Sequence, residues 1–240
     1  MNRLVGAIGI VMPAVIGWVT FAGAGTPAPT PPADTGTIMG TVRFTGTVPP
    51  PKKVMVSDGS TIEHRDLVVD PQTKGLRDVM ALLEDAPAQP RVKDAKPVLV
   101  DQRDWVFIPR VVGVQHGQPV RFDNSDSVNH SVMAISTVKA NQFNSVAGPG
   151  TPIVHVFEPQ KPPVVIGCSL HPWMRAWVYV VPHPWFAVTD EQGRFRIAGV
   201  PPGKYTLLLA HPDTNRREQR TVEVRVGQTT AVTIEWNAVK

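Results

Sequence analysis

The segment Cys168–Met174 (CSLHPWM) holds the only cysteine of the 240-residue chain, with His171 and Met174 following at intervals of three residues. Thiolate, imidazole and thioether are donors for soft and borderline metals. Copper that cycles between its two oxidation states suits this mixture, because sulfur favours the reduced ion and imidazole serves both. A tight loop between two strands could direct all three donors toward one centre. The segment therefore predicts part of a copper site.

A fourth donor has to come from another strand, and His130 is the candidate. The predicted strand that ends in PVRFDN (119–124) is followed by a short polar turn, which places His130 at the start of the next predicted strand. A lone cysteine is more often an inert buried thiol, but its combination with His171, Met174 and His130 favours copper. His155, in the middle of a predicted strand, is a weaker candidate for an extra donor.

Other uses of the thiol fit the sequence less well. A cysteine beside a histidine can be a nucleophile with its base, but here the base lies three residues along the same loop and no oxyanion-hole motif accompanies it. A closed zinc site would not select methionine, and a redox disulfide needs a second thiol. We therefore expect a protein that is not an enzyme.

Residues 1–24 have one positive charge, Arg3, then an apolar run that ends in Ala22-Gly23-Ala24. This pattern predicts a signal peptide cleaved after Ala24 and hence a periplasmic or otherwise exported protein. An uncleaved membrane anchor is the alternative, although Pro13 and the glycines within the run favour cleavage. Residues 25–36 are expected to form a proline-rich linker.

The charge balance limits the possible partners. The chain carries 24 basic and 20 acidic residues, a net charge of +4, and removal of residues 1–24 would leave +3. Proteins that bind nucleic acid or a membrane surface usually have clustered basic patches, and the sequence has no such cluster. We expect no nucleic-acid partner, no membrane insertion after cleavage of the signal peptide, and a redox protein as partner.

Beyond the linker, short apolar and alternating runs are separated by turns rich in proline and glycine, and the chain has 25 prolines. This pattern predicts an all-β protein. Leu76–Leu83 differs, because its apolar residues at 76, 79, 80 and 83 have helical spacing, although a buried strand would also fit. Strands are expected at 38–44, 98–100, 111–114, 120–122, 153–157, 164–166, 176–181, 194–197, 205–209, 221–226 and 231–236.

Residues 98–181 resemble a cupredoxin, the family of small blue copper proteins that includes plastocyanin and amicyanin. The resemblance lies in DWVFIP (104–109), VQHG (114–117), VRFDN (120–124), HSV (130–132) and CSLHPWMRAWVYVV (168–181). It implies a Greek-key sandwich with one type 1 copper ion held by His130, Cys168, His171 and, axially, Met174. Gly167 and Ala176 depart from the usual pattern without removing a donor. Ser131 and Ser169, beside two ligands, are expected to join their loops by a hydrogen bond.

The flanks resemble a second family. Residues 187–212 are similar to the second half of a carboxypeptidase regulatory-like, transthyretin-type β-sandwich, and residues 36–51 with 75–85 are similar to its first half. We therefore expect one sandwich built from 37–97 and 182–240, with the cupredoxin domain inserted, as in exported proteins described as methylamine-utilisation-like. In that arrangement residues 78–83 form a strand.

Together these features predict a type 1 copper protein that transfers single electrons between redox partners, with His171 as the electron exit and Trp173 in an apolar rim around it. Two alternatives remain open. One is a copper-binding or structural module without electron-transfer turnover, and the other is a carbohydrate- or surface-binding sandwich with a vestigial metal site.

Overall fold

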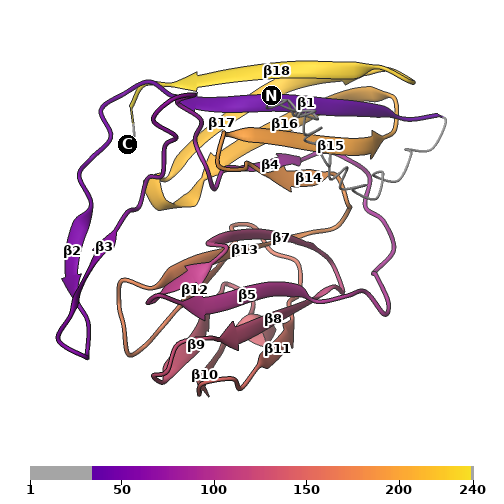
Figure 1. Ribbon diagram of the computed structural model, residues 1–240. Coiled ribbons are helices and arrows are strands. Elements are labelled where there is room, and N and C mark those ends of the chain that lie inside the picture. The colour runs from indigo at the N-terminus through magenta and orange to yellow at the C-terminus, as the bar shows by residue number, and fades with distance from the viewer. Residues whose placement is uncertain (1–33, 239–240) are drawn as a thin grey trace, which may run out of the picture. The chain divides into compact units, whose positions relative to one another are not determined.

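The structure, a computed structural model, describes residues 34–238, which belong to one compact unit. The predicted signal peptide and most of the predicted linker lie outside these residues. The described chain is all-β: its strands form five sheets, joined by turns and two single-turn 3₁₀ helices, η1 (Lys139–Asn141) and η2 (Pro212–Thr214) (Figure 1). Within the described range no helix has both the length and the apolar character needed to cross a membrane.

The first β-sandwich is discontinuous in sequence. One sheet has the order β15-β1-β18 and the other β14-β4-β16-β17, so strands from before residue 84 pair with strands from after residue 185. Their apolar faces share one core that includes Phe44, Leu83, Ile197 and Trp236. The strands are β1 (Gly36–Phe44), β4 (Met80–Leu83), β14 (Phe186–Val188), β15 (Arg194–Val200), β16 (Gly203–His211), β17 (Arg216–Val224) and β18 (Thr229–Trp236).

The second sandwich uses the chain between β4 and β14. Its sheets have the orders β10-β9-β12-β13-β7 and β11-β8-β5-β6, and they enclose a separate core that includes Phe107, Phe122, Phe157 and Ile166. β5 runs parallel to β8 and β13 parallel to β7, so the chain crosses between the sheets to form these pairs. The strands are β5 (Val98–Arg103), β6 (Val106–Ile108), β7 (Val111–Gln115), β8 (Pro119–Asn124), β9 (His130–Ile135), β10 (Phe143–Ala147), β11 (Ile153–Val156), β12 (Val164–Gly167) and β13 (Arg175–Val181).

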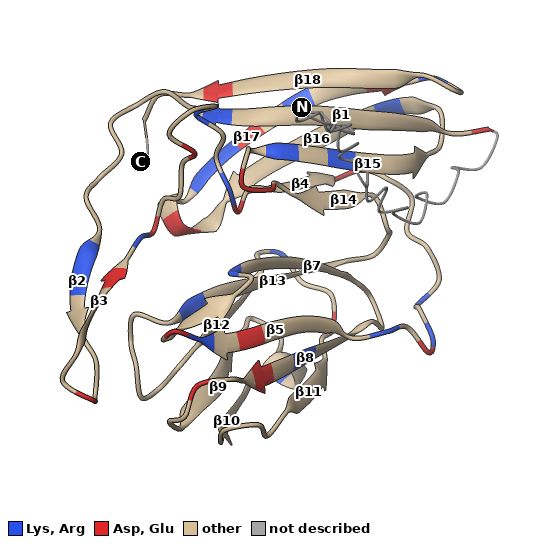
Figure 2. Cartoon of the chain, in the orientation of Figure 1, with Lys and Arg blue, Asp and Glu red and all other residues tan. Residues whose placement is uncertain are grey.

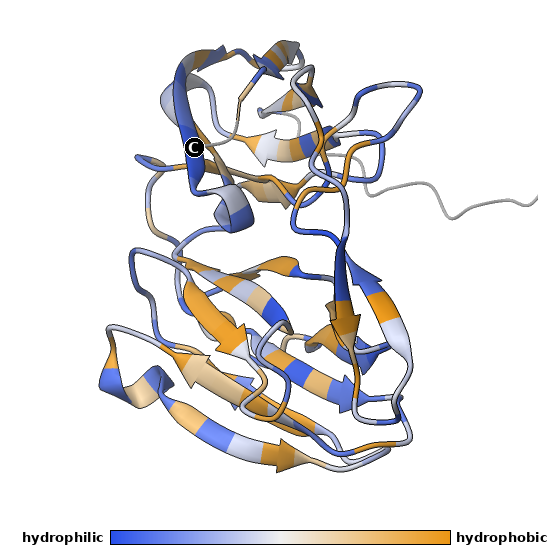
Figure 3. Cartoon of the chain, turned by 90° about the vertical axis from the view of Figure 1, so that its left-hand side faces the viewer, coloured by the Kyte–Doolittle hydropathy of each residue, from blue (hydrophilic) through white to orange (hydrophobic). Residues whose placement is uncertain are grey.

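Alternation of apolar and polar residues explains most of these strands. In β15 (RFRIAGV) the phenylalanine, the isoleucine and the last valine are buried while the arginines are exposed, because successive side chains point to opposite faces of a sheet. The same alternation of hydropathy is visible along several strands in Figure 3. Each sandwich therefore buries one face of each sheet.

The two sandwiches meet through a third apolar cluster. Met80, Leu208 and Ala210 from the first sandwich pack with Val111, Trp177, Tyr179 and Val181 from the second. An ion pair between the buried side chains of Arg110, just before β7, and Asp213, in η2 after β16, also joins the two sandwiches. The two-stranded hairpin of β2 (Lys52–Met55) and β3 (Thr61–His64) is tied to this region by a hydrogen bond from Arg110 Nη1 to the carbonyl of Arg65, 2.6 Å long.

The segment with helical spacing is a strand. Residues 80–83 form β4, which is buried on both faces because one face lies in the first core and Met80 lies in the cluster between the sandwiches. A strand buried on both sides reads as a continuous apolar run, so its spacing in sequence is misleading.

Charged residues of both signs are interspersed over the strands of both sandwiches (Figure 2).

Candidate metal centre

Three predicted donors meet at one end of the second sandwich. His130 is the first residue of β9, while Cys168 and His171 lie in the loop that joins β12 to β13. Their ligand atoms all lie within 4.8 Å of one another, and all three residues are buried. Among the described residues this is the one group of three or more histidine, cysteine or acidic side chains with such spacing.

The distances fit a common ion. His130 Nδ1 lies 2.9 Å from His171 Nδ1, and Cys168 Sγ lies 3.5 Å from the same His171 nitrogen. Nitrogen and sulfur donors that bind one ion at about 2.0–2.3 Å are about 3–4 Å apart. Two imidazoles and a thiolate in this arrangement match the trigonal set of a blue-copper site. The residues present therefore suit copper.

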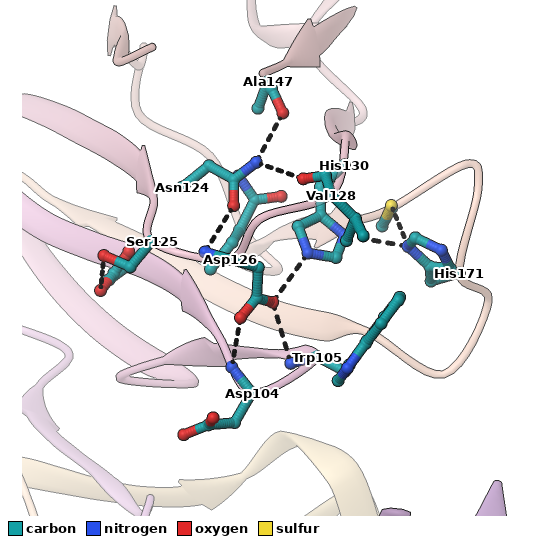
Figure 4. A network of polar contacts seen from close by, with 12 residues as sticks. Asp104, Trp105, Asn124, Ser125, Asp126, Val128, His130, Ala147 and His171 are labelled. Atoms are coloured by element: carbon teal, nitrogen blue, oxygen red, sulfur yellow. Dashed lines mark hydrogen bonds and ion pairs between the residues drawn. The ribbon is translucent and has the colours of Figure 1, made fainter. Parts of the chain in front are cut away.

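Asp126 determines which nitrogen of His130 faces the centre (Figure 4). Asp126 Oδ2 lies 2.9 Å from His130 Nε2, so this nitrogen carries the proton that the carboxylate accepts. In the neutral imidazole Nδ1 then keeps its lone pair and points toward His171 and Cys168. A carboxylate partner of this kind fixes both the tautomer and the ring orientation of a metal-binding histidine.

Asp126 is itself held by the chain. Its carboxylate accepts hydrogen bonds from the backbone amides of Asp104 at 2.8 Å and Trp105 at 3.1 Å, and its own amide donates to Asn124 Oδ1 at 3.0 Å. Asp104 and Trp105 form the two-residue turn between β5 and β6. The parallel pairing of β5 with β8 brings this turn beside the β8–β9 loop, so His130 is positioned by two elements at once.

The Cys168 sulfur is enclosed by backbone and hydroxyl donors. The Ser131 amide donates to Sγ at 3.3 Å, and Ser131 Oγ lies 3.8 Å from the same atom. Ser131 Oγ also contacts Ser169 Oγ at 2.8 Å and accepts from the Ser169 amide at 2.7 Å. The expected bond between the two loops is thereby confirmed. It ties the loop that carries Cys168 to the strand that carries His130.

The electrostatics favour the metal-binding protonation states of Cys168 and His171, whereas His130 has to lose a proton when it binds a metal. Burial alone raises the pKa of Cys168, but contacts with His130, Ser131 and Leu170 outweigh it and lower the pKa to about 7. Burial lowers the pKa of His171, as does the charge of His130. For His130, burial works against protonation, yet Cys168 and Asp126 together raise its pKa. These pKa directions favour the thiolate of Cys168 and the neutral imidazole of His171 near neutral pH.

Met174 closes the loop and lies in the core. Its amide donates to the His171 carbonyl at 3.0 Å, and its carbonyl accepts from the Cys168 amide at 3.3 Å. The side chain is fully buried in the same apolar cluster as Cys168. Its role as an axial donor stays a prediction. At Gly167, one of the two departures from the usual pattern, an added Cβ would meet Met133 Cε at 3.5 Å, which is ordinary contact.

His171, the expected electron exit, is the most exposed of the four predicted ligands but is itself largely covered. His171 is only 7% exposed, and its ring is contacted by Trp105, with ring centroids 5.0 Å apart, and by Trp173, at 5.2 Å. Trp105 also meets the His130 ring edge-on at 5.6 Å. Trp173 is half-buried and donates from Nε1 to the Trp105 carbonyl at 3.2 Å. The two indoles, rather than the His171 edge, are thus the more exposed groups at the site.

Sequence reasoning missed Asp126 and Trp105 as parts of the site. Asp126 stands four residues before His130, and Trp105 lies between two short β-type runs, but neither feature alone indicates a metal. His155, the weaker candidate, packs its ring against Phe143 and Phe157, each at 4.6 Å, and is not among the grouped donors.

Comparison with known proteins agrees with parts of this picture. Residues 171–237 match the family described as carboxypeptidase regulatory-like domain, beginning inside the ligand loop and ahead of the predicted start at residue 182. A search of curated proteins finds no match.

Among solved structures, a purple cupredoxin from Nitrosopumilus maritimus is 25% identical, with a TM-score of 0.31 over 35% of this chain and 98% of that one. A reduced amicyanin variant is 19% identical, with a TM-score of 0.31 over 42% and 97% of the two chains. The copper-containing nitrite reductase NirK from Thermus scotoductus SA-01 is 27% identical, with a TM-score of 0.32. That match covers 38% of this chain and only a quarter of the reductase. With TM-scores this low, any functional argument has to rest on the site itself.

Proposed function

We propose that this protein is an exported type 1 copper protein that transfers single electrons between redox partners. The observation that carries the proposal is the buried group of His130 Nδ1, Cys168 Sγ and His171 Nδ1, in which every ligand atom lies within 4.8 Å of the others. Copper, when bound, would supply a one-electron couple there, and Met174 would be the weak fourth donor beside His130, Cys168 and His171.

The donor set favours electron transfer over simple metal retention. A trigonal arrangement of two imidazoles and a thiolate lies between the geometries that the two oxidation states prefer. The surrounding residues make that arrangement rigid: Asp126 holds His130, the Ser131–Ser169 contact holds the thiolate loop, and Met174 closes the loop through its backbone. Side chains that are already fixed move little when the charge at the centre changes, so electron transfer needs little rearrangement.

The remaining parts of the proposal come from the sequence. The pattern of residues 1–24 supports export, and a redox protein of unspecified kind is the proposed partner. The discontinuous first sandwich, with the second inserted, is the arrangement expected for a methylamine-utilisation-like exported protein, and we propose that the flanks tether or dock the electron carrier. We propose no catalytic activity, because the thiol, both imidazoles and the methionine are all assigned to the metal.

Electron exchange separates this function from copper storage. The chain is loaded with one equivalent of Cu(II), and its oxidation and reduction are followed by voltammetry and by rapid mixing with a small one-electron carrier. The proposal expects a reversible one-electron wave and exchange with the carrier in both directions. Copper that stays bound but is not reduced and reoxidised reversibly would support a storage role instead. Asp123→Ala, which changes an exposed ion pair with Arg121 on β8, is a control that should leave the wave unchanged.

A further inference from the structure

Trp105 occupies a backbone position that rarely carries a large side chain. Asp104 and Trp105 form the two-residue β5–β6 turn and have φ angles of 54° and 64°. Turns with positive φ at both central residues strongly favour asparagine, aspartate and glycine. A tryptophan in this conformation is strained, and such strain persists only where the surroundings hold it. Stability of the turn therefore does not explain the choice of residue.

The surroundings hold Trp105 from two sides. Asp126 accepts the amides of both turn residues, and Trp173 Nε1 donates to the Trp105 carbonyl. With the backbone fixed in this way, the indole stands edge-on to the rings of His130 and His171, at interplanar angles of 88° to each. The strained backbone thus directs the indole toward the imidazoles of both His130 and His171.

We infer that Trp105 is a cover residue, which keeps water and small external ligands away from the metal-binding imidazoles of His130 and His171. His171 is nearly inaccessible although the Trp105 beside it is half-buried and faces solvent in part. A bulky indole in this place blocks approach along the side of the site where the two rings meet. As far as it concerns the metal, the inference rests on the proposed function.

Whether the metal site binds an external ligand depends on whether that ligand can reach it. A site with three strong protein donors and an open approach can take up an extra anion or water, as catalytic metal sites do when they keep an open position. A covered site keeps only its protein donors through both oxidation states. With Trp105 in place, the site would keep only its protein donors and act as an electron carrier. Without Trp105, the same site would bind small molecules.

The first test needs no metal. Trp105→Gly removes the indole and also relieves the positive-φ strain, and Trp105→Phe keeps a smaller ring. Diethylpyrocarbonate reacts with accessible neutral imidazoles, and mass spectrometry of the peptide containing His171 gives the rate at that residue. In the metal-free chain we expect about a tenfold faster modification of His171 in Trp105→Gly, because local protection is lost, and a smaller increase in Trp105→Phe.

Two controls make the result decisive. Val154→Ala removes an exposed side chain from β11, in the other sheet of the same sandwich, and should leave the rate unchanged. His183 and His211 are buried in or beside the first sandwich and report on the fold: they should stay protected. An unchanged rate at His171 in Trp105→Gly overturns the inference. Faster reaction at all three histidines also overturns it, because the tryptophan would then hold the fold together rather than cover one site.

The second test uses azide as a small anionic probe of the Cu(II)-loaded chain. The wild type should show no new absorption on addition of azide, whereas Trp105→Gly should gain an azide-to-copper band that saturates. If Trp105→Gly exposes His171 but binds no azide, exclusion of ligands by Trp105 is wrong. If the wild type binds no copper, the proposed function is wrong, while the reaction of His171 still tests the cover.

Discussion

The loss of Asp126 is the perturbation whose effect can be worked out most fully from the structure. Its carboxylate accepts three N–H groups: His130 Nε2 at 2.9 Å, the Asp104 amide at 2.8 Å and the Trp105 amide at 3.1 Å. The His130 side chain is fully buried and that of Asp126 is only 14% exposed. A hydrogen bond to a charged group contributes about 1.5–3 kcal/mol. The Asp104 and Trp105 amides lie in an exposed turn and can form hydrogen bonds with water instead, so their bonds to Asp126 contribute less to stability.

Asp126→Ala should therefore lower the free energy of unfolding of the metal-free chain by about 3 kcal/mol. It should also weaken copper binding about 10- to 100-fold, because His130 loses the partner that fixes its tautomer. Urea unfolding measures the first quantity, and competition with a chelator of known affinity measures the second. Asp126→Asn, which keeps one acceptor oxygen, should lie between the wild type and Asp126→Ala in both.

The matched control is Asp123→Ala, three residues earlier on β8. Asp123 pairs with Arg121 at 2.7 Å in an exposed ion pair, and such pairs contribute about 0–1 kcal/mol. Copper affinity should not change in this variant. Equal effects of Asp123→Ala and Asp126→Ala, or wild-type copper affinity in Asp126→Ala, would refute the role assigned to Asp126.

Three further outcomes are expected. Gly75→Ala should cost about 2–3 kcal/mol of unfolding free energy, because its Cβ would lie 2.1 Å from the backbone of Gln192, while Gly148→Ala, with nearest contacts at 3.6 Å, should be nearly neutral. Burial lowers the pKa of His211 to about 4, so below pH 6.5 the unfolded chain takes up a proton at this residue that the folded chain does not. The contribution of His211 to the free energy of unfolding should therefore fall by up to about 3 kcal/mol between pH 6.5 and 4, and His211→Asn should remove this contribution from the slope. A wild-type slope in His211→Asn would contradict this. Met174→Leu keeps the apolar volume and should unfold near the wild-type midpoint, but it should raise the reduction potential if the thioether is the axial donor; an unchanged potential would remove Met174 from the site.

Much of the fold could be predicted from local pattern. Alternating runs such as 194–197 and 231–236 lie in strands because one face of each is buried in a core. The hairpin of β2 and β3 has no strong sequence signal because each strand is only four residues long and most of its side chains are exposed or partly exposed. β4 was ambiguous because it is buried on both faces, which erases the two-residue period.

The residues of the site likewise fall into those that a local sequence pattern predicts and those that it does not. Cys168 and His171 are neighbours in one loop, so their spacing alone suggested a shared centre, and His130 was found from the turn before it. Asp126 and Trp105 are 21 residues apart and meet only because β5 pairs with β8. No local pattern encodes that contact. The same contact places the Trp105 indole beside the His171 ring.

Copper titration of the purified chain tests whether Cys168, His130 and His171 bind one ion together. We expect that one equivalent of Cu(II) binds and produces an intense visible thiolate-to-copper absorption, which is absent in Cys168→Ser. We also expect bound copper to protect the Cys168 thiol from alkylation. Copper bound without that absorption, or a thiol that reacts equally fast with and without the metal, would show that the sulfur and the two imidazoles do not close around a common ion.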